Sequence, residues 1–150
     1  MQANANKAIP RTRASIVCLH DQRLLMIELE DPSTKKRMWS LPGGKIEELE
    51  TPGQAAIRET LEETGYAVTG LSNSRVSHYQ FRWDSHIFDC QCHWFRAELI
   101  SMNANPVDDA DYLLRCAWIP MHRAAALLRY HPHIAGQTQE LMSTAALSRL

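Results

Sequence analysis

A single well-delimited helix near the middle of the chain is the sequence feature that most constrains the fold. Thr51 is a good N-cap, Pro52 suits the first helical position, and Gln54 stands three residues after Thr51, the spacing of a capping box. Gly65 supplies a C-terminal stop. The residues between these signals are therefore predicted to form one helix, with strand-like segments on both sides of it.

Those flanking segments predict the sheet. Residues 14–20 and 23–29 are apolar, partly β-branched runs separated by a two-residue polar turn, which favours a β-hairpin. A short strand over residues 39–45 ends in a Pro-Gly-Gly turn. Further strands are expected over residues 66–71, 76–83, 86–99 and 112–119, followed by helices over 121–130 and 136–150. This order predicts an α+β fold, an α/β/α sandwich with a mixed sheet.

The central helix has an apolar face. Ile57 and Leu61 form an i,i+4 pair, flanked by Ala56, Thr60 and Thr64. We expect this face to pack against the sheet.

Another face of the same helix is acidic. Glu59, Glu62 and Glu63 project together, and Glu59 repels each of the other two by roughly 0.2–0.5 kcal/mol. The helix macrodipole also disfavours anions in this C-terminal half, and only Arg58, four residues before Glu62, offsets part of the repulsion. Carboxylate oxygens are the ligands that Mg²⁺, Mn²⁺ and Ca²⁺ prefer. The cluster is therefore either a divalent-cation site or a solvated acidic face.

The residues around the cluster decide between these readings, because they match Gly-x5-Glu-x7-Arg-Glu-U-x-Glu-Glu-x-Gly-U, where U is a bulky apolar residue. The matching positions are Gly44, Glu50, Arg58, Glu59, Glu62, Glu63 and Gly65. This is the Nudix box, and the sequence resembles the Nudix hydrolases of the MutT-like kind. Two positions depart from the pattern: Thr60 stands at the first U, and Leu49 stands where the family usually has Gly.

The resemblance implies a loop-helix-loop site on an α/β/α sandwich. It implies hydrolysis of the diphosphate linkage in a nucleoside triphosphate or in a nucleoside diphosphate joined to another group. The expected cofactor of this reaction is Mg²⁺, with Mn²⁺ as a substitute. By the same resemblance Glu59 and Glu63 are metal ligands, Glu62 is a further ligand or the general base, and the Gly43 carbonyl completes the metal shell.

The resemblance also implies supporting and substrate-binding roles. Arg58 would orient the carboxylates through a bidentate salt bridge, and Glu50 would hold Arg58 or contact a second metal. Gly44 lets the chain turn close to the phosphates, and the expected phosphate-binding cations are Lys45, Arg37 and Arg13. Many members of the family add one carboxylate from downstream, for which the candidates are Glu98, Asp108, Asp109 and Asp111.

The strand over residues 86–99 carries two further candidates. Its alternation places Cys90 and Cys92 on one face and His93 on the other, so core cysteines are favoured over a zinc site. Aromatic residues on this strand and its neighbour are either core residues or a wall on which a base stacks, and the core reading is favoured: Tyr79, Phe81, Trp83 and Trp94.

Length and composition narrow the remaining choices. A chain of 150 residues with 45% hydrophobic residues fits one globular domain, expected over residues 13–150 after a flexible tail over residues 1–12. A formal net charge of −1 leaves no dense basic patch, so nucleic acid is an unexpected partner. No apolar run is long enough for a membrane span, and neither a signal peptide nor a disulfide framework is indicated, so a cytoplasmic location is expected. A homodimer stays open.

Two other functions stay open beside the hydrolase. The first is a non-catalytic nucleotide-binding regulatory module on the same fold, although all box carboxylates are present. The second is an RNA 5′-end pyrophosphohydrolase, against which the weak basicity speaks. The sequence leaves the nucleotide or other diphosphate substrate and the number of metal ions undetermined.

Overall fold

Strand β1 (Ile9–His20) is the centre of the fold. In the computed structural model, which describes residues 7–107 and 111–147, β1 pairs in parallel with β7 (His86–Leu99) from Ile9–Phe88 to Cys18–Ala97. It also pairs antiparallel with the short strand β4 (Gly43–Lys45) and turns directly into β2 (Arg23–Glu30). Residues 14–19 are all buried, as expected for a strand covered on both faces.

The other strands extend the sheet on both sides of β1. The path β3-β2-β1-β7-β5 is joined by β8 on β2 and by β6 on β7, and every pairing apart from β1–β7 is antiparallel. The remaining elements are β3 (Arg37–Ser40), α1 (Pro52–Thr64), β5 (Val68–Thr69), β6 (Arg75–Trp83), β8 (Leu113–Pro120), α2 (Met121–Leu127) and α3 (Pro132–Leu147). The mixed sheet predicted from the sequence is confirmed.

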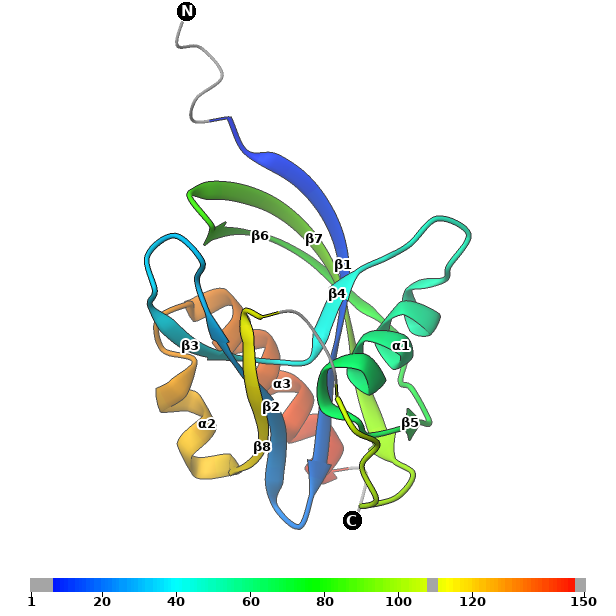
Figure 1. Cartoon of the computed structure of the whole chain (residues 1–150). Helices are drawn as coiled ribbons and strands as arrows, with labels where there is room; N and C mark the ends of the chain where they lie inside the picture. The colour runs from blue at the N-terminus through cyan, green and yellow to red at the C-terminus, as the bar shows by residue number, and fades with distance from the viewer. Residues whose placement is uncertain (1–6, 108–110, 148–150) are drawn as a thin grey trace, which may run out of the picture.

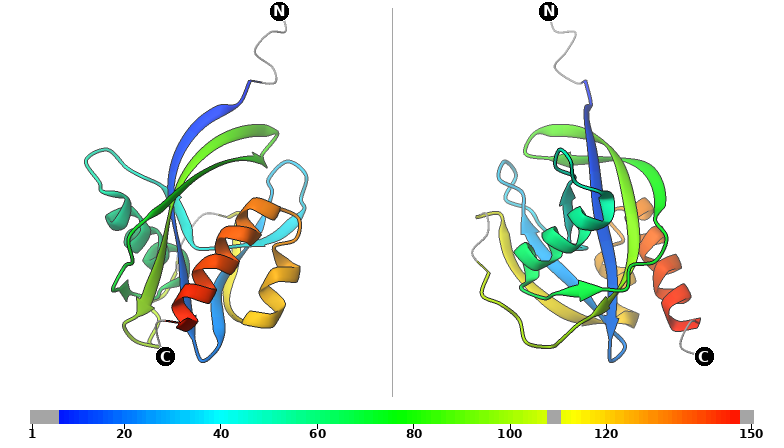
Figure 2. Two further views of the ribbon diagram at one scale, coloured as in Figure 1. Left: turned by 180° about the vertical axis from the view of Figure 1, so that it is seen from behind. Right: turned by 90° about the vertical axis from the view of Figure 1, so that its right-hand side faces the viewer.

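Helices cover the sheet from both sides. Figures 1 and 2 show α1 on one side and α2 with α3 on the other. Because successive side chains of β1 point to opposite faces, Ile16 and Cys18 belong to the core under α1, whereas Val17 and Leu19 belong to the core under α2 and α3. Successive side chains of β1 therefore contribute alternately to the two cores that separate the sheet from its two helical layers.

Helix α1 begins and ends where the sequence predicts. The Thr51 hydroxyl accepts a hydrogen bond from Gln54 N at 3.1 Å, and the Gln54 side chain accepts one from Thr51 N at 2.9 Å. Gly65 ends the helix in the left-handed conformation, with φ of 77°. Both capping predictions are confirmed.

The predicted inner face of α1 is correct for Ala56, Thr60 and Thr64 but wrong for the central pair Ile57 and Leu61. Ile57 and Leu61 are each 37% exposed, and the buried residues are Ala55, Ala56, Thr60, Glu63 and Thr64. Thr60 and Thr64 remain compatible with burial because each hydroxyl donates to a carbonyl one turn earlier, at 2.8 and 2.6 Å. Small side chains let α1 lie close to β1 and β4, and this close approach brings Glu63 inward.

Several boundaries also differ from the sequence prediction. The single strand predicted over residues 39–45 is two strands, β3 and β4, and the strand predicted over residues 66–71 is reduced to β5. β1 includes residues 9–12, which we assigned to a tail, because their backbone continues the parallel ladder with β7. α3 begins at Pro132, four residues before the predicted start, and Leu141 is buried as expected. Within the described residues, no helix combines the length and the apolarity that crossing a bilayer requires.

Candidate active site

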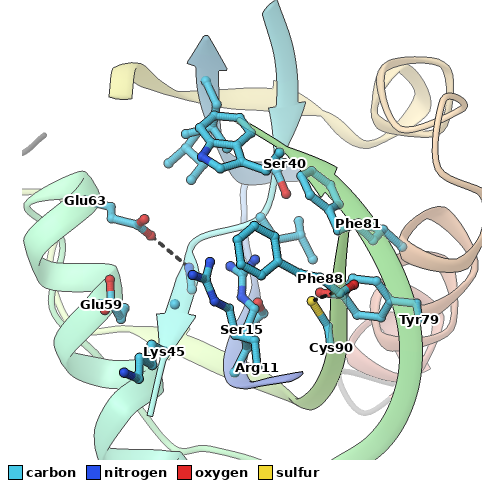
Figure 3. A pocket seen from close by; sticks show the side chains of 18 of the residues that line it. Arg11, Ser15, Ser40, Lys45, Glu59, Glu63, Tyr79, Phe81, Phe88 and Cys90 are labelled. Carbon is cyan, nitrogen blue, oxygen red and sulfur yellow. Dashed lines mark hydrogen bonds between the residues drawn. The ribbon is translucent and has the colours of Figure 1, made fainter. Parts of the chain in front are cut away.

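A cavity of about 240 Å³ lies between α1 and the β6–β7 hairpin. Figure 3 shows Glu59 and Glu63 of α1 on one side and Tyr79, Phe81 and Phe88 on the other. Side chains from β1 and β4, among them Arg11, Ser15 and Lys45, lie between these two sides. The cavity therefore has an acidic wall, an aromatic wall and cationic side chains close to both.

Arg58 ties the acidic wall together through all five of its N–H donors. Nε and Nη2 donate to the two oxygens of Glu50, at 2.7 and 3.0 Å. Nη1 donates to Glu59 Oε1 at 2.9 Å and to Glu62 Oε2 at 3.2 Å, and Nη2 also donates to the Lys45 carbonyl at 3.0 Å. A guanidinium has five donors, so Arg58 is fully used in holding the loop, the strand end and the helix in one arrangement.

Glu50 anchors this arrangement on the loop before α1. Its carboxylate accepts the bidentate pair from Arg58 and a further hydrogen bond from Glu47 N at 2.9 Å. The hydrogen bond from Arg58, and then the one from Glu47, lower the pKa of Glu50 to about 2. Glu50 is therefore ionised throughout the physiological pH range, and the structure places it on Arg58, one of the two positions expected for it.

Glu63 and Glu59 reach the cavity by different routes. Glu63 is only 6% exposed, and its Oε1 accepts a hydrogen bond from Gly43 N at 2.8 Å. The Glu59 carboxylate lies over Gly44, where an added Cβ would come within 2.6 and 2.7 Å of its two oxygens. Burial raises the pKa of Glu59, and Arg58 offsets only part of this effect. A side chain at position 44 would therefore displace the Glu59 carboxylate.

Glu62 differs from these two carboxylates. Its side chain is 50% exposed, it pairs with Arg58, and it does not line the cavity. Arg58 thus pairs with Glu59 and Glu62, whereas Glu63 accepts a hydrogen bond from Gly43 N, so the three box glutamates occupy different environments.

The predicted phosphate-binding cations separate into two groups. Arg13 and Lys45 line the cavity, and the charge of Arg13 acts on both Glu59 and Glu63. The buried Arg13 Nε–H has no hydrogen-bond acceptor within the described part of the chain. Arg37, contrary to the expectation, does not line the cavity: it pairs with Glu30 at 3.3 Å on the β2–β3 ladder.

The aromatic wall comes from alternate positions of β6. Tyr79, Phe81 and Trp83 are partly buried and line the cavity, while Gln80 and Arg82 between them are exposed. Tyr79 and Phe81 also pack against the core under α2 and α3. The prediction that these aromatic residues belong to the core is therefore only partly correct. One side of the rings packs against the core, and the other side faces the cavity.

Strand β7 confirms the predicted alternation around its cysteines. Cys90 and Cys92 are buried on the face that also carries Trp94, and Cys90 lines the cavity. Burial raises the pKa of the Cys92 thiol to about 11, which keeps it protonated at neutral pH.

The two downstream carboxylates that lie within the described residues, Glu98 and Asp111, do not line the cavity. Glu98 lies at the far end of β7, where it contacts Gly70, and Asp111 is exposed just before β8. Asp108 and Asp109 lie outside the described residues.

Among the lining residues that sequence reasoning missed is the cation Arg11. Arg11 lies on the same face of β1 as Arg13, and its guanidinium is 4.0 Å from the ring centroid of Phe88. The alternation of Arg11, Arg13 and Ser15 in the sequence is the signal that identifies this face. This alternation was overlooked because strands are recognised by alternating apolar residues, and the face of a strand that lines a polar cavity has none.

The donor set fits a hard divalent cation. Glu59 and Glu63 offer carboxylate oxygens in one cavity, and partial burial raises the pKa of Glu59 despite the nearby Arg58 and Arg13. Across residues 7–107 and 111–147, no three His, Cys, Asp or Glu side chains are grouped closely enough to hold one ion. Glu59 and Glu62 are instead paired with Arg58, so an ion would have to share these carboxylates with that arginine.

Comparison with known proteins places this fold and site in a family. The family model described as NUDIX domain matches residues 10–141. The chain therefore belongs to the Nudix family. A Nudix hydrolase from Nitrosomonas europaea has the same fold, with a TM-score of 0.75 and 21% sequence identity over 90% of each chain.

Two curated relatives are also similar to this chain. It is 30% identical over 118 residues to CMP-5′-(N-acetyl-N-hydroxy-3-aminopropyl)phosphonate hydrolase of Streptomyces rubellomurinus, covering 77% of this chain and 55% of that protein. It is 38% identical over 56 residues to 8-oxo-dGTP diphosphatase of Proteus vulgaris, covering 37% of this chain and 50% of that protein. The chain spans about half the length of the curated relatives it matches.

Proposed function

We propose that the chain is a metal-dependent pyrophosphohydrolase that cleaves the diphosphate linkage of a nucleoside triphosphate or of a nucleoside diphosphate joined to another group. The observation that carries this proposal is the single cavity that joins Glu59 and Glu63 to an aromatic wall. A nucleotide has the matching chemistry, with a charged phosphate chain at one end and a flat base at the other. The named activities of the two curated relatives, both toward nucleotides, also support the proposal.

Each wall has a distinct task in this proposal. Arg13, Lys45 and Arg11 bind the phosphate oxygens, and Tyr79 and Phe81 contact the base. Arg58 and Glu50 contact no substrate and hold the carboxylates in register. Gly43 and Gly44 let the backbone lie against Ser15 and Glu59, which a side chain would prevent.

Glu59 and Glu63 would hold Mg²⁺ or Mn²⁺, with Glu62 and the Gly43 carbonyl as further ligands. Such an ion supplies charge neutralisation of the phosphates and acidification of a bound water. Glu62, as the alternative to a ligand role, takes the proton from the attacking water. Its partial exposure leaves it accessible to water, and its pairing with Arg58 orients its carboxylate for that role.

The first experiment is a substrate panel with Mg²⁺ that includes nucleoside triphosphates, 8-oxo-dGTP, nucleoside diphosphate conjugates and 5′-triphosphate RNA. Release of phosphate and of pyrophosphate is measured separately. Hydrolysis of RNA alone would favour the 5′-end pyrophosphohydrolase. Nucleotide binding without any hydrolysis would favour the non-catalytic regulatory module.

The second experiment removes one charge. Glu62→Gln is expected to lower turnover on the best substrate by roughly 10²–10⁴-fold, the usual contribution of a positioned acid or base. The melting temperature should stay close to wild type, because the substitution also removes a like-charge repulsion with Glu59. The matched control is Glu48→Gln on the exposed loop before α1, which should keep wild-type turnover. Turnover of Glu62→Gln within a few-fold of wild type would transfer the role to Glu59.

A further inference from the structure

The aromatic wall of the cavity is carried by an edge strand. β6 pairs with β7 along one side, and no strand among the described elements pairs with its other side. Backbone groups along such an edge need other partners, and the strand can shift unless something holds it. What holds β6 therefore sets where Tyr79 and Phe81 lie in the cavity.

The segment that begins α3 provides the first such contact. His131 Nε2 donates a hydrogen bond to the Gln80 carbonyl at 2.8 Å, and Gln80 is the residue between Tyr79 and Phe81. His131 Nδ1 accepts a hydrogen bond from Ile134 N at 3.3 Å. A carbonyl only accepts and a backbone amide only donates, so the two contacts together select the neutral tautomer with the proton on Nε2.

A second contact lies three residues earlier on β6. His133 Nε2 is 2.8 Å from Ser77 Oγ, which also accepts a hydrogen bond from Trp94 Nε1 at 2.8 Å. Burial lowers the pKa of His133, which favours a neutral ring that accepts a hydrogen bond from the Ser77 hydroxyl. The start of α3 thus holds β6 on both sides of Tyr79.

The same two histidines contact the cavity-lining rings directly. His131 stacks on Phe81, with ring centroids 5.6 Å apart and an interplanar angle of 24°. His133 lies 5.2 Å from Tyr79 at 30°, and His131 meets Tyr79 edge-on at 5.2 Å. Ile134, whose amide binds His131, itself lines the cavity.

We infer that His131 and His133 are positioning residues for the proposed reaction, which fix the aromatic wall against the base of the substrate through Gln80, Ser77 and the two rings. This inference rests on the proposed function. The base lies away from the bond that breaks, so the wall binds substrate and transition state equally. Loss of such uniform binding raises KM and leaves kcat unchanged. Loss of folded protein instead lowers apparent kcat and leaves KM unchanged.

The test uses two variants on the triphosphate with the best turnover. His131→Phe keeps a ring beside Phe81 and removes both hydrogen bonds, and Ser77→Ala removes the partner of His133. Each should raise KM by about three- to tenfold, the equivalent of one lost hydrogen bond, with kcat within twofold of wild type. Combined with Phe81→Leu, His131→Phe should raise KM less than the two separate effects predict, because it acts through Phe81.

The matched control breaks another contact between the same two elements. Arg75 of β6 pairs with Glu140 and contacts Gln137 at 3.4 Å on α3, away from the aromatic rings. Arg75→Gln should leave both KM and kcat at wild-type values. A KM increase in Arg75→Gln equal to that in His131→Phe would show general loosening of α3 and overturn the inference.

The remaining outcomes are also decisive. Wild-type turnover with an unchanged KM in His131→Phe, or additive effects with Phe81→Leu, overturns the inference and leaves the proposed function intact. If wild type hydrolyses nothing, the proposed function fails, and the positioning role is tested by tryptophan fluorescence titration with 8-oxo-dGTP and CMP. An equal affinity of wild type and His131→Phe for these probes, or no binding by either, overturns the positioning role as well.

Discussion

Leu49 adopts a backbone conformation that its side chain disfavours. Its φ is 67°, in the left-handed region, and its side chain is 99% exposed in the loop before α1. The exposed side chain contributes no burial that could offset the conformational cost. The departure from the usual family Gly at this position therefore strains the loop.

We predict that Leu49→Gly stabilises the protein. Removing the strain of the left-handed conformation should raise the free energy of unfolding by roughly 1–2 kcal/mol. The greater conformational freedom of Gly in the unfolded chain should reduce this gain by about half. Urea unfolding should show a higher midpoint with an unchanged slope. The control is Glu48→Gly, whose position lacks a positive φ and which should lower the midpoint. A lower midpoint for Leu49→Gly would contradict the strain.

Individual residues also mark what the sequence could and could not predict. Thr51, Gln54 and Gly65 act through neighbours within four residues, so the local pattern was sufficient. Arg37 was misassigned because its partner, Glu30, is set by the register of two strands. Residues that act across elements require the tertiary structure.

At the scale of elements, the inner face of α1 illustrates a limit of periodicity. A hydrophobic pattern favours the bulky pair Ile57 and Leu61, yet the helix packs through Ala55, Ala56 and Thr60. Close packing against β1 and β4 selects small side chains, and it is this closeness that brings Glu63 to Gly43 N. The pattern identified the helix and its acidic residues, while the distance to the sheet decided which face is buried.

Asp31 joins two chain segments at one end of the sheet. Its Oδ1 accepts hydrogen bonds from Ser33 N at 2.8 Å and Thr34 N at 3.3 Å, and its Oδ2 accepts one from Asp84 N at 3.3 Å. Ser33 Oγ donates to Asp84 Oδ1 at 2.6 Å. The loop after β2 is thereby tied to the β6–β7 turn, next to Trp83 of the aromatic wall.

We predict that Asp31→Asn destabilises the protein in a pH-dependent manner. Burial raises the pKa of Asp31, but the hydrogen bonds from Ser33, Thr34 and Asp84 outweigh it, and the net pKa is lowered from 3.8. Because the folded pKa lies below the unfolded one, the stabilisation is present above the unfolded pKa and is lost as pH falls through the folded pKa. At pH 7 the variant should lose roughly 1–3 kcal/mol of unfolding free energy.

Urea unfolding at pH 7 and at pH 3 measures this effect. The difference between wild type and Asp31→Asn should be smaller at pH 3. Asp21→Asn is the control, because Asp21 is exposed and Asn also tolerates its positive φ of 51°. An equal loss of unfolding free energy at both pH values would show that the effect of Asp31→Asn does not depend on ionisation of Asp31.

For the whole molecule, metal binding should appear as thermal stability. An ion held by Glu59 and Glu63 relieves a buried negative charge and binds only the folded state. At a hundred times its dissociation constant it adds about 2.7 kcal/mol, which raises the melting temperature by roughly 5–10 °C for a chain of this size.

Thermal melting with increasing Mg²⁺ or Mn²⁺ measures the shift. Glu59→Gln should abolish most of it, and Glu48→Gln should keep it. A melting temperature that does not change up to millimolar metal, in wild type as in Glu59→Gln, would contradict a metal site on α1.

The parallel pairing of β1 with β7 has a consequence for synthesis of the chain. β1 leaves the ribosome before β7, its long ladder partner, which follows roughly eighty residues later. Until then the apolar residues 14–19 have only the short pairings to β2 and β4, and neither core can close around them. The nascent chain therefore exposes the buried residues of β1 while roughly eighty further residues are synthesised, and this interval is when a chaperone would have most to bind.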